Sequence, residues 1–419
     1  MDHFESKDGA LFAEDVPLDT IAETVGTPVY VYSAATLRRH YRVFANSVSA
    51  LDTLVAYSVK ANSNLAVLSL LGQMGAGADV VSGGELERAI RAGIAPDKIV
   101  FSGVGKSQAE MRAALKAGIF QFNVESRSEL EALNRVALSM GKTAPIALRI
   151  NPNVGAGGHE KITTGKAENK FGVDISLARK AYARAASLPG ISVQGVDMHI
   201  GSQITDLSPI GQAIDRLLGL VEDLRADGHE IRTFDVGGGL GIVYDETTDC
   251  PASPADYGAL VSEKLTGRGL KAIFEPGRMI AGNAGVLLSR VRYIKTGGAR
   301  NFLILDAAMN DLIRPALYGA HHAIVPVKPS DGPTMRYDVV GPVCESGDTF
   351  AKGVQLPKMQ EGDLVILRSA GAYGAVQAGQ YNTRPLVPEA LVDGARFEII
   401  RKRPTIDDML AHEHIPDWL

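Results

Sequence analysis

One lysine lies where a lysine side chain is energetically unfavourable. Residues 55–59 (Val-Ala-Tyr-Ser-Val) are small, β-branched or aromatic, which is typical of a short buried strand, and Lys60 follows them directly. An ammonium group at the end of a buried strand must be paired or neutralised. A desolvated lysine amine loses its proton more easily and can form a Schiff base with an aldehyde cofactor. The ordinary alternative is a lysine that extends its charged end into water.

A glutamate and a histidine end two other predicted strands. Glu275 lies in the stretch Phe-Glu-Pro-Gly-Arg, residues 274–278, and a buried carboxylate there needs a cationic partner. A protonated pyridine nitrogen is such a partner, and a pyridine ring that stays positive is a better electron sink for a carbanion. His199 lies in the stretch Met-His-Ile-Gly-Ser-Gln, residues 198–203. It is either a core histidine satisfied by hydrogen bonds or a ring stacked on a flat cofactor.

Three consecutive glycines and an arginine suggest that an anion binds nearby. Residues 237–239 are all glycine, and such a segment is either a tight turn or a nest whose backbone N–H groups bind a phosphate. Arg278 can hold a phosphate or a carboxylate through two parallel hydrogen bonds, or it is a surface residue. Asp79 and Arg149 also lie in or near predicted strand ends. Asp79 either hydrogen-bonds within its own loop or takes part in catalysis.

The elements that position these residues alternate between strand and helix. Eight short apolar strands are predicted at 54–59, 79–82, 99–102, 121–124, 146–151, 195–200, 233–236 and 272–275. Helical patterns separate them at 66–74, 84–92, 107–117, 128–139, 176–187, 210–226 and 254–266. Strands that are buried on both faces favour a parallel sheet, and eight repeats favour an α/β fold closed into a (β/α)8 barrel, with functional groups at the C-terminal strand ends. The alternative, a doubly wound open sheet, usually has fewer strands and a glycine-rich loop after the first one.

The alternation stops near residue 278. Strand-like segments separated by proline and glycine turns follow at 285–295, 301–305, 334–340, 364–367 and 396–400. They predict a C-terminal all-β domain of the sandwich or barrel type. An early strand at 28–32 precedes the barrel and is expected to join this domain. We therefore expect a barrel domain over residues 36–278 and a β domain made of residues 1–35 and 279–419.

The predicted β domain carries a second group of reactive side chains. Cys344 stands next to Glu345 in a turn-rich segment; a lone cysteine is usually structural, but a thiol in such a loop can donate a proton. With no second cysteine or histidine close by, we expect no metal site there. Tyr373 lies between glycines, where its phenol can reach a ligand. Arg314 and Tyr318 are further polar candidates that are otherwise ordinary surface residues.

Composition excludes several classes of function. The net charge of −5 over 419 residues, with an isoelectric point near 6.0, gives no reason to expect binding to nucleic acid or to an anionic membrane. Cys250 and Cys344 alone do not make a disulfide framework, so a reducing cytoplasm is expected. No run of about 18 apolar residues occurs, so no transmembrane helix is expected. The polar N-terminus has no signal-peptide pattern.

Six motifs, in chain order across both predicted domains, resemble the diaminopimelate decarboxylase family. The motifs are Tyr-Ser-Val-Lys-Ala-Asn (57–62), His-Ile-Gly-Ser-Gln (199–203), Gly-Gly-Gly (237–239), Glu-Pro-Gly-Arg (275–278), Cys-Glu-Ser-Gly-Asp (344–348) and Ala-Tyr-Gly (372–374). Members of this family are pyridoxal-phosphate enzymes of the alanine-racemase-like fold. The resemblance covers nearly the whole chain, and Ser58 is the one departure, at a position where the family often has alanine.

The resemblance implies pyridoxal 5′-phosphate as the cofactor and assigns residues to it. Lys60 would carry the cofactor, His199 would stack on its pyridine ring and Glu275 would pair with the ring nitrogen. Tyr373 would touch both cofactor and substrate. The further residues that we expect to bind the cofactor are Ser202, Gly237, Gly238, Gly239, Pro276, Gly277, Arg278, Asp79 and Arg149.

The resemblance also implies a substrate and a reaction. The enzyme would decarboxylate meso-2,6-diaminopimelate to L-lysine and carbon dioxide, the last step of lysine biosynthesis. Arg278, Arg314 and Tyr318 would bind the distal carboxylate end of the substrate, and Glu345 would bind its distal amine. Cys344 would protonate the carbon that carbon dioxide has left. In this family the loop that begins at Cys344 serves the active site of the other subunit, so a homodimer is implied.

Three related classes fit the sequence less well. Alanine racemases of this fold place an arginine at the pyridine nitrogen, where Glu275 stands here. Ornithine and arginine decarboxylases share the lysine and a comparable glutamate, but here Cys344 is followed by Glu345 rather than aspartate. A substrate with a second amino-carboxylate head needs both a cationic and an anionic group. The small pyridoxal-phosphate-binding barrel proteins have no β domain, so residues 285–400 argue against them.

Overall fold

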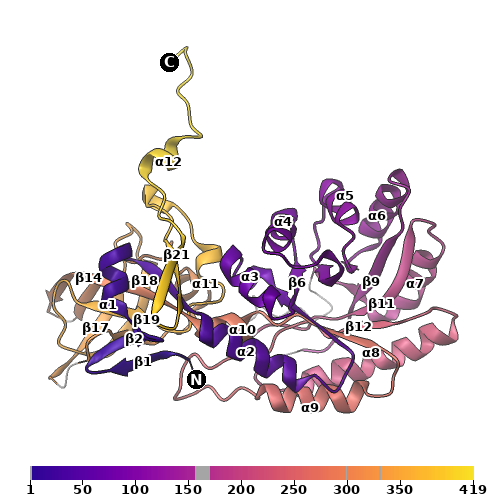
Figure 1. Cartoon of the computed structure of the whole chain (residues 1–419), viewed down its shortest axis with the longest axis horizontal. Coiled ribbons are helices and arrows are strands. Elements are labelled where there is room, and N and C mark those ends of the chain that lie inside the picture. Colours follow the sequence, from indigo (N-terminus) through magenta and orange to yellow (C-terminus); the bar gives the residue numbers. More distant parts are fainter. Residues whose placement is uncertain (1, 156–169, 299, 330–331) are drawn as a thin grey trace. The chain divides into compact units, whose positions relative to one another are not determined.

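The chain forms two compact units in the structure, a computed structural model that describes residues 2–155, 170–298, 300–329 and 332–419 (Figure 1). The barrel unit consists of Arg38–Val243 and Asp249–Ile280. The β unit consists of Met1–Leu37, Tyr244–Thr248 and Ala281–Leu419. The short segment Tyr244–Thr248 thus belongs to the β unit although barrel segments flank it in the sequence.

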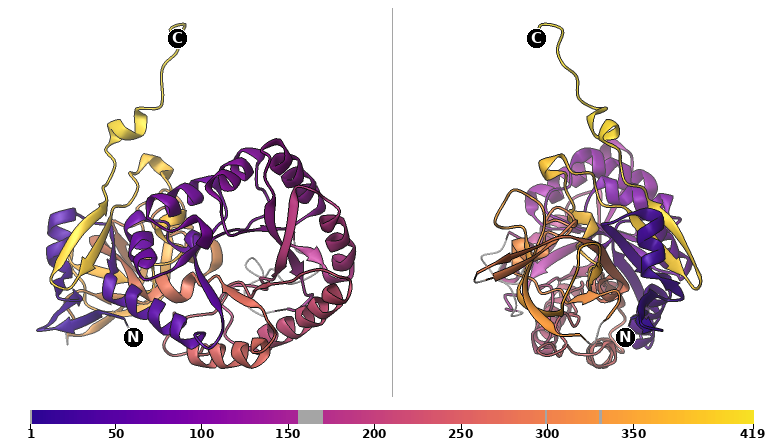
Figure 2. Two further views of the ribbon diagram at one scale, coloured as in Figure 1. Left: turned by 45° about the vertical axis from the view of Figure 1, so that its right-hand side comes forward. Right: turned by 90° about the vertical axis from the view of Figure 1, so that its left-hand side faces the viewer.

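Eight parallel strands close the barrel unit into a ring, with helices around the outside (Figure 2). In ring order they are β5 (Thr53–Ser58), β6 (Gly77–Val80), β7 (Ile99–Phe101), β8 (Gln121–Val124), β9 (Ala144–Asn151), β11 (Ile191–Asp197), β12 (Thr233–Asp235) and β13 (Lys271–Phe274). β13 pairs with β5, and β8 pairs with β9, which completes the closure. A two-residue strand, β10 (Val173–Asp174), also pairs with β9. The predicted (β/α)8 barrel is confirmed.

Among the described residues, five helices of the barrel unit begin at a serine or asparagine whose side chain caps the helix. The helices of this unit are α2 (Ala34–Ser47, which begins in the β unit), α3 (Leu65–Gln73), α4 (Gly83–Arg91), α5 (Gln108–Ala117), α6 (Arg127–Ser139), α7 (Ala178–Ala186), α8 (Ser208–Ala226) and α9 (Pro254–Leu265). The capped helices are α3, α4, α5, α6 and α9. The Ser107 and Ser253 side chains each accept a hydrogen bond from the backbone three residues later, and Glu110 and Asp256 return one. Such reciprocal caps satisfy two backbone N–H groups that the helix leaves unbonded.

β6 and β11 are among the strands that begin earlier than the apolar pattern predicts. β6 starts at Gly77, where a side chain would lie 2.2 Å from the Lys98 carbonyl oxygen. β11 starts at Ile191 and passes through Gly195, whose missing Cβ would lie 1.9 Å from Thr233 Oγ1. Glycine is required where neighbouring backbones approach this closely, although glycine itself is a poor indicator of a strand. The observed end of β11 also places His199 in the loop beyond the strand.

The β unit is built on a sheet of mixed strand directions. Its main sheet comprises β4 (Val29–Ser33), β14 (Gly285–Gly297), β15 (Arg300–Leu305), β16 (Ile324–Pro326), β17 (Thr334–Val340), β18 (Thr349–Pro357), β19 (Leu364–Leu367), β20 (Glu389–Asp393) and β21 (Arg396–Arg401). β1 (Phe4–Lys7), β2 (Ala10–Ala13) and β3 (Val16–Pro17) form a small antiparallel sheet. The short helices are α1 (Leu18–Val25), α10 (Arg278–Ala281, which begins in the barrel unit), α11 (Arg314–Tyr318) and α12 (Ile406–Leu410).

The early strand joins the sheet of the β unit, as the sequence predicts. β4 pairs antiparallel with β14 and parallel with β20. Its side chains Val29 and Val31 are fully buried and belong to a core that also contains Leu288 and Ile366. Burying these side chains is worth roughly 2 kcal/mol each, so the N-terminal segment is an integral part of this unit.

Among the helices that the structure describes, none combines the length and the apolar character needed to cross a membrane.

Candidate active site

Lys60 is paired with a buried aspartate at the mouth of the barrel. β5 ends at Ser58, and Lys60 lies in the 3-10 turn Val59–Ala61 that follows. Lys60 Nζ donates to Asp79 Oδ2 at 2.7 Å, and Ser58 Oγ donates to the same oxygen at 2.6 Å. Burial raises the pKa of Asp79, but the charge of Lys60 and these hydrogen bonds outweigh it, so the pKa lies below its ordinary value. An ionised carboxylate therefore faces the lysine amine.

The ring of His199 is neutral. The backbone N–H of Gly238 donates to His199 Nδ1 at 3.2 Å, so this nitrogen carries no proton. Burial, and then the positive charges of Arg149 and Lys60, lower the pKa of His199 to about 3. The 3.9 Å separation of His199 Nδ1 from Glu275 Oε2 is therefore not an ion pair. A neutral ring can stack on a cationic pyridine ring without charge repulsion.

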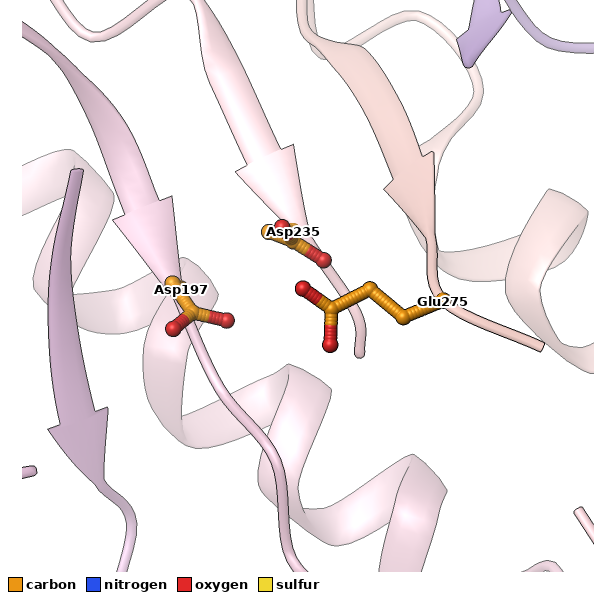
Figure 3. A group of neighbouring side chains, drawn as sticks. All are labelled: Asp197, Asp235 and Glu275. Atoms are coloured by element: carbon orange, nitrogen blue, oxygen red, sulfur yellow. The ribbon is translucent and has the colours of Figure 1, made fainter. Parts of the chain in front are cut away.

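Three carboxyl groups converge inside the barrel from successive strands (Figure 3). Asp197 ends β11, Asp235 ends β12 and Glu275 follows β13, and one carboxyl oxygen of each lies within 4.8 Å of the other two. All three side chains are buried. Burial is the main cause that raises the pKa of each carboxyl group, and the charges of neighbouring carboxylates add to it.

Two neutral side chains donate hydrogen bonds into this carboxyl cluster. Asn123 Nδ2 lies 3.0 Å from Asp235 Oδ2 and 3.3 Å from Glu275 Oε1, and Ser102 Oγ donates to Glu275 Oε1 at 3.2 Å. Asp197 Oδ1 is buried without a hydrogen-bond partner among the described residues. The neutral donors only partly compensate the charged forms of these carboxyl groups, so a cation that also donates a hydrogen bond would be favoured there.

A protonated pyridine nitrogen fits this requirement. It supplies both a positive charge and an N–H donor, and Glu275 presents a carboxylate at the barrel mouth, as expected from the sequence. Carboxylate oxygens also suit hard metal ions. However, the N–H donors of Asn123 occupy oxygens of Asp235 and Glu275 and would compete with metal coordination.

The glycine triplet is required by close contacts between strand ends. A Cβ at Gly237 would lie 2.4 Å from the Met198 carbonyl oxygen, and one at Gly238 would lie 2.2 Å from the Glu275 carbonyl oxygen. Gly237 and Gly239 also have positive φ angles of 73° and 108°. The N–H groups of Gly237 and Gly238 donate to Asp235 and His199. Gly239 is therefore the member of the triplet whose N–H group we expect to bind a phosphate.

The turn after β13 lies next to Ser58 and to Ser202, and Ser202 is a predicted site residue. Arg278 is buried, and its Nη2 donates to Ser202 Oγ at 2.9 Å. The Ser58 N–H donates to the Pro276 carbonyl oxygen at 3.1 Å, and the Gly277 carbonyl oxygen accepts from Ile280. The structure therefore brings the 275–278 motif together with the ends of β5 and β11, which are distant in the sequence.

The side chain of Arg149 contacts the backbone of His199. Its Nη1 pairs with Glu125 Oε1 at 3.0 Å, and its Nη2 donates to the His199 carbonyl oxygen at 3.3 Å. The guanidinium also lies over the ring of Phe171, 4.9 Å from its centroid. These contacts describe a residue that holds the His199 loop in place, whereas our sequence prediction assigns Arg149 directly to the cofactor.

Sequence reasoning missed Asn123, Asp197, Asp235 and Glu125. Asp235 directly precedes the glycine triplet, and Asp197 stands two residues before His199. Buried polar residues in otherwise apolar strands are unusual, so their positions next to recognised motifs were a usable signal.

The remaining predicted residues lie in the β unit. Cys344 and Glu345 are exposed in a loop that Asp348 holds in place. The two carboxylate oxygens of Asp348 accept hydrogen bonds from the backbone of Met309 and of Val343, each at 2.7 Å. The loop is thereby tied to the segment that leads into α11.

Arg314 begins α11 and is buried, and Tyr318 ends the same helix, with its hydroxyl 3.5 Å from Gln377 Nε2. Tyr373 has a φ angle of 56°, which is unfavourable for a residue with a side chain. The flanking Gly371 and Gly374 leave no room for a Cβ, which would lie 2.1 Å and 2.5 Å from neighbouring atoms. Dense packing thus fixes the backbone that presents the Tyr373 phenol.

Comparison with known families gives the class first. A family model described as "Pyridoxal-dependent decarboxylase, pyridoxal binding domain" matches residues 34–282. This range includes the whole barrel, with Lys60, His199 and Glu275 at its mouth. Fold, site and family model together define the class as that of the pyridoxal-dependent decarboxylases.

Full-length relatives narrow the class. Diaminopimelate decarboxylases of Vibrio cholerae and Pseudomonas aeruginosa are both 51% identical to the chain, over 99% of each protein. The crystal structure of diaminopimelate decarboxylase from M. jannaschii in complex with L-lysine has a TM-score of 0.95 at 36% identity, covering 100% of this chain and 99% of that one. The Helicobacter pylori enzyme complexed with L-lysine has a TM-score of 0.91 at 41% identity, covering 94% and 98%. The chain belongs to the diaminopimelate decarboxylase family.

Proposed function

We propose that this enzyme removes carbon dioxide from meso-2,6-diaminopimelate and releases L-lysine, with pyridoxal 5′-phosphate as its cofactor. The observation that carries the proposal is the 51% identity to diaminopimelate decarboxylases over 99% of both chains. The reaction is the last step of lysine biosynthesis, and the enzyme is a carboxy-lyase.

The barrel residues would hold the cofactor. Lys60 would attach it, Glu275 would pair with its ring nitrogen and the neutral His199 ring would stack on its pyridine ring. The residues that would contact its phosphate are Gly239 with its neighbours Gly237 and Gly238, Ser202, and the turn formed by Pro276, Gly277 and Arg278. When bound, the cofactor supplies an electron sink for the carbanion that remains when carbon dioxide leaves.

Two carboxylates influence where protons lie in this site. Asp79 Oδ2, 2.7 Å from Lys60 Nζ, holds the lysine amine in position and stabilises its protonated form, and this proton must leave before the amine can react as a nucleophile. Glu275 would keep a proton on the ring nitrogen, because the buried charge of the Glu275 carboxylate is costly without a cationic partner. Asn123 and Ser102 keep the Glu275 carboxylate in a fixed orientation.

The β unit would supply most of the groups that recognise the substrate. Arg314 and Tyr318, together with Arg278, bind the distal carboxylate, and Glu345 binds the distal amine. A cation and an anion together select a substrate with a second amino-carboxylate head over ornithine or arginine. Cys344 donates a proton to the substrate carbon, and Tyr373 touches both substrate and cofactor.

We further propose that the enzyme is a cytoplasmic homodimer in which the loop from Cys344 to Asp348 completes the site of the other subunit. The exposure of Cys344 and Glu345 supports this, because a proton donor and a substrate ligand need a covering surface to exclude water. Mixing inactive Lys60→Ala and Cys344→Ala proteins should restore about one quarter of the parent activity, since half of the randomly formed dimers then contain one intact site. No restoration after confirmed subunit exchange would contradict a shared site.

Carbon dioxide release tests the proposed reaction. The purified protein with pyridoxal phosphate should release carbon dioxide from meso-diaminopimelate and much less from ornithine or arginine. A preference for ornithine or arginine would refute the substrate assignment while leaving the class intact.

A further inference from the structure

His322 makes two hydrogen bonds through its two ring nitrogens. It lies in the β unit between α11 and β16, and its side chain is 2% exposed. Nε2 is 2.8 Å from Arg314 Nη1, and Nδ1 is 2.8 Å from the carbonyl oxygen of Arg368. The histidine therefore bridges a proposed substrate ligand and the backbone of the sheet.

These two partners determine where the proton of the His322 ring lies. A carbonyl oxygen can only accept a hydrogen bond, so Nδ1 must carry the proton. A guanidinium group can only donate, so Nε2 must present its lone pair. His322 is therefore neutral, in one tautomer, and acts as the acceptor for Arg314.

Backbone elements hold this arrangement in place. Gly319, with a φ angle of 61°, ends α11 and turns the chain back, so that His322 comes close to the first residue of the same helix. β16 pairs with β19, and Arg368, which follows β19, donates its N–H to the Ala323 carbonyl oxygen at 2.9 Å. The acceptor for His322 Nδ1 is thus fixed by the sheet.

The Tyr244 ring packs against both Arg314 and His322. The Arg314 guanidinium lies over the Tyr244 ring, 4.6 Å from its centroid. The same ring stands edge-on to His322, with centroids 5.5 Å apart and an interplanar angle of 79°. An aromatic face orients a guanidinium by a cation–π contact. Tyr244 belongs to the β unit together with the short segment Tyr244–Thr248 that it begins.

We propose that His322 is a positioning residue that fixes the Arg314 guanidinium for the distal carboxylate of the substrate; this rests on the proposed role of Arg314. A neutral acceptor orients the guanidinium without cancelling its positive charge. A carboxylate in its place would also orient Arg314, but it would compete with the carboxylate of the substrate. Together with the Tyr244 ring, His322 restricts the rotation of the guanidinium plane.

Binding of two ligands, L-lysine and cadaverine, distinguishes the positioning of Arg314 by His322 from a general structural role of His322. L-Lysine, the product, retains the distal amino-carboxylate head, whereas cadaverine lacks the carboxylate. The His322→Asn variant keeps a donor near the Nδ1 position for the Arg368 carbonyl oxygen but is too short to accept from Arg314. The His322→Gln variant is the matched control, because its longer amide can reach Arg314.

The dissociation constants of both ligands, measured by changes in cofactor absorbance of the holoenzyme, test the proposal. We expect His322→Asn to weaken L-lysine binding by about tenfold or more, as for the loss of a hydrogen bond to a charged group. Cadaverine binding should change less than about twofold, and His322→Gln should recover most of the L-lysine affinity. The KM for meso-diaminopimelate should rise more than kcat falls.

Unchanged L-lysine binding in His322→Asn, or an equal loss of cadaverine binding, would overturn the proposal. So would a His322→Gln variant as impaired as His322→Asn. Failure of the parent enzyme to decarboxylate meso-diaminopimelate would instead refute the proposed function, so the two failures are distinct. If His322→Asn does not bind the cofactor, L-lysine and cadaverine binding are compared in Arg314→Lys instead, a variant that keeps the positive charge and loses the planar guanidinium. Arg314→Lys should lose affinity for L-lysine and not for cadaverine. An equal loss of affinity for both ligands overturns the proposal.

Discussion

Replacing Glu275 by glutamine should change the apoprotein and the cofactor-bound enzyme in opposite directions. Glutamine has the same shape, can keep the hydrogen bonds from Asn123 and Ser102, and removes one negative charge beside Asp235 and Asp79. Relief of this unfavourable buried charge should raise the free energy of unfolding of the apoprotein by about 1–3 kcal/mol at neutral pH.

The sign of the pH dependence follows from the raised pKa of Glu275. Burial first, and then the charges of Asp235 and Asp79, raise this pKa above its ordinary value of 4.5. The folded apoprotein therefore loses stability as the pH rises above 4.5, because the unfolded chain releases this proton more easily. The stabilising effect of Glu275→Gln should disappear as the pH falls to that value.

With the cofactor bound, the same substitution removes the anionic partner of the ring nitrogen. Cofactor affinity should fall by about 10- to 100-fold, as for the loss of a hydrogen bond between charged groups. The kcat should fall by about 100-fold or more, because the ring becomes a weaker electron sink.

Urea denaturation of the apoprotein, cofactor titration and carbon dioxide release measure the three effects. Glu125→Gln is a matched control, since it removes a buried carboxylate that already pairs with Arg149. It should destabilise the apoprotein, because it leaves a buried cation unpaired. A Glu275→Gln apoprotein that is less stable than the parent, or that binds the cofactor equally well, would refute the reasoning.

Four further substitutions probe other parts of the site. Lys60→Ala should abolish both activity and the visible absorbance of the lysine-bound cofactor, and retained absorbance would refute its assignment. Glu345→Ala should reduce diaminopimelate turnover by about 100-fold and leave the cofactor dissociation constant unchanged; an equal loss of both would tell against a substrate role. Gly238→Ala should destabilise the fold by about 2 kcal/mol or more, because the new methyl group meets the Glu275 carbonyl oxygen at 2.2 Å; the control Gly105→Ala meets nothing within 4 Å and should be nearly neutral. The apoprotein should lose stability as the pH falls from 6.5, an ordinary histidine pKa, to about 3, because the buried His199 ring resists protonation. The His199→Gln variant should lose less stability over this pH range, and an unchanged loss would contradict a buried neutral ring.

The sequence predicted the barrel because its signal is local and repeated. Most barrel strands are short, mainly apolar segments, and Ser107 and Ser253 mark where helices begin. The errors occur where tertiary contacts override local preference. Gly77 lies inside β6, before the predicted start at residue 79, because the neighbouring backbone leaves no space for a side chain, and this reason is invisible in the sequence.

The β unit was harder to predict than the barrel. β18 contains Gly353 with a φ angle of 68° and pairs with β17 through two register shifts, so its side chains do not alternate regularly. β18 and β20 were not predicted. The parallel pairing of β20 with β4 joins residues more than 350 positions apart, and no local pattern indicates such a pairing.

The site residues that belong to short sequence motifs were predictable, whereas the hydrogen bonds between residues distant in the sequence were not. Lys60, His199 and Glu275 stand at strand ends, which a barrel brings to one mouth. The hydrogen bond from Asn123 to Asp235 joins residues 112 positions apart. The pairing of Asp79 with Lys60 is likewise a property of the folded barrel. The roles of Asp79 and Arg149 toward the cofactor stay predictions.

The attachment point of the cofactor tests the account most directly. The holoenzyme is reduced with borohydride, which fixes an aldehyde cofactor to the amine that holds it, and the modified peptide is identified by mass spectrometry. We predict that the cofactor is found on Lys60. Lys106 is the informative competitor, since it is a buried lysine of the barrel paired with Glu129 at 2.8 Å, whereas the Lys60 side chain is 33% exposed. Modification of Lys106, or of any lysine other than Lys60, would contradict the account.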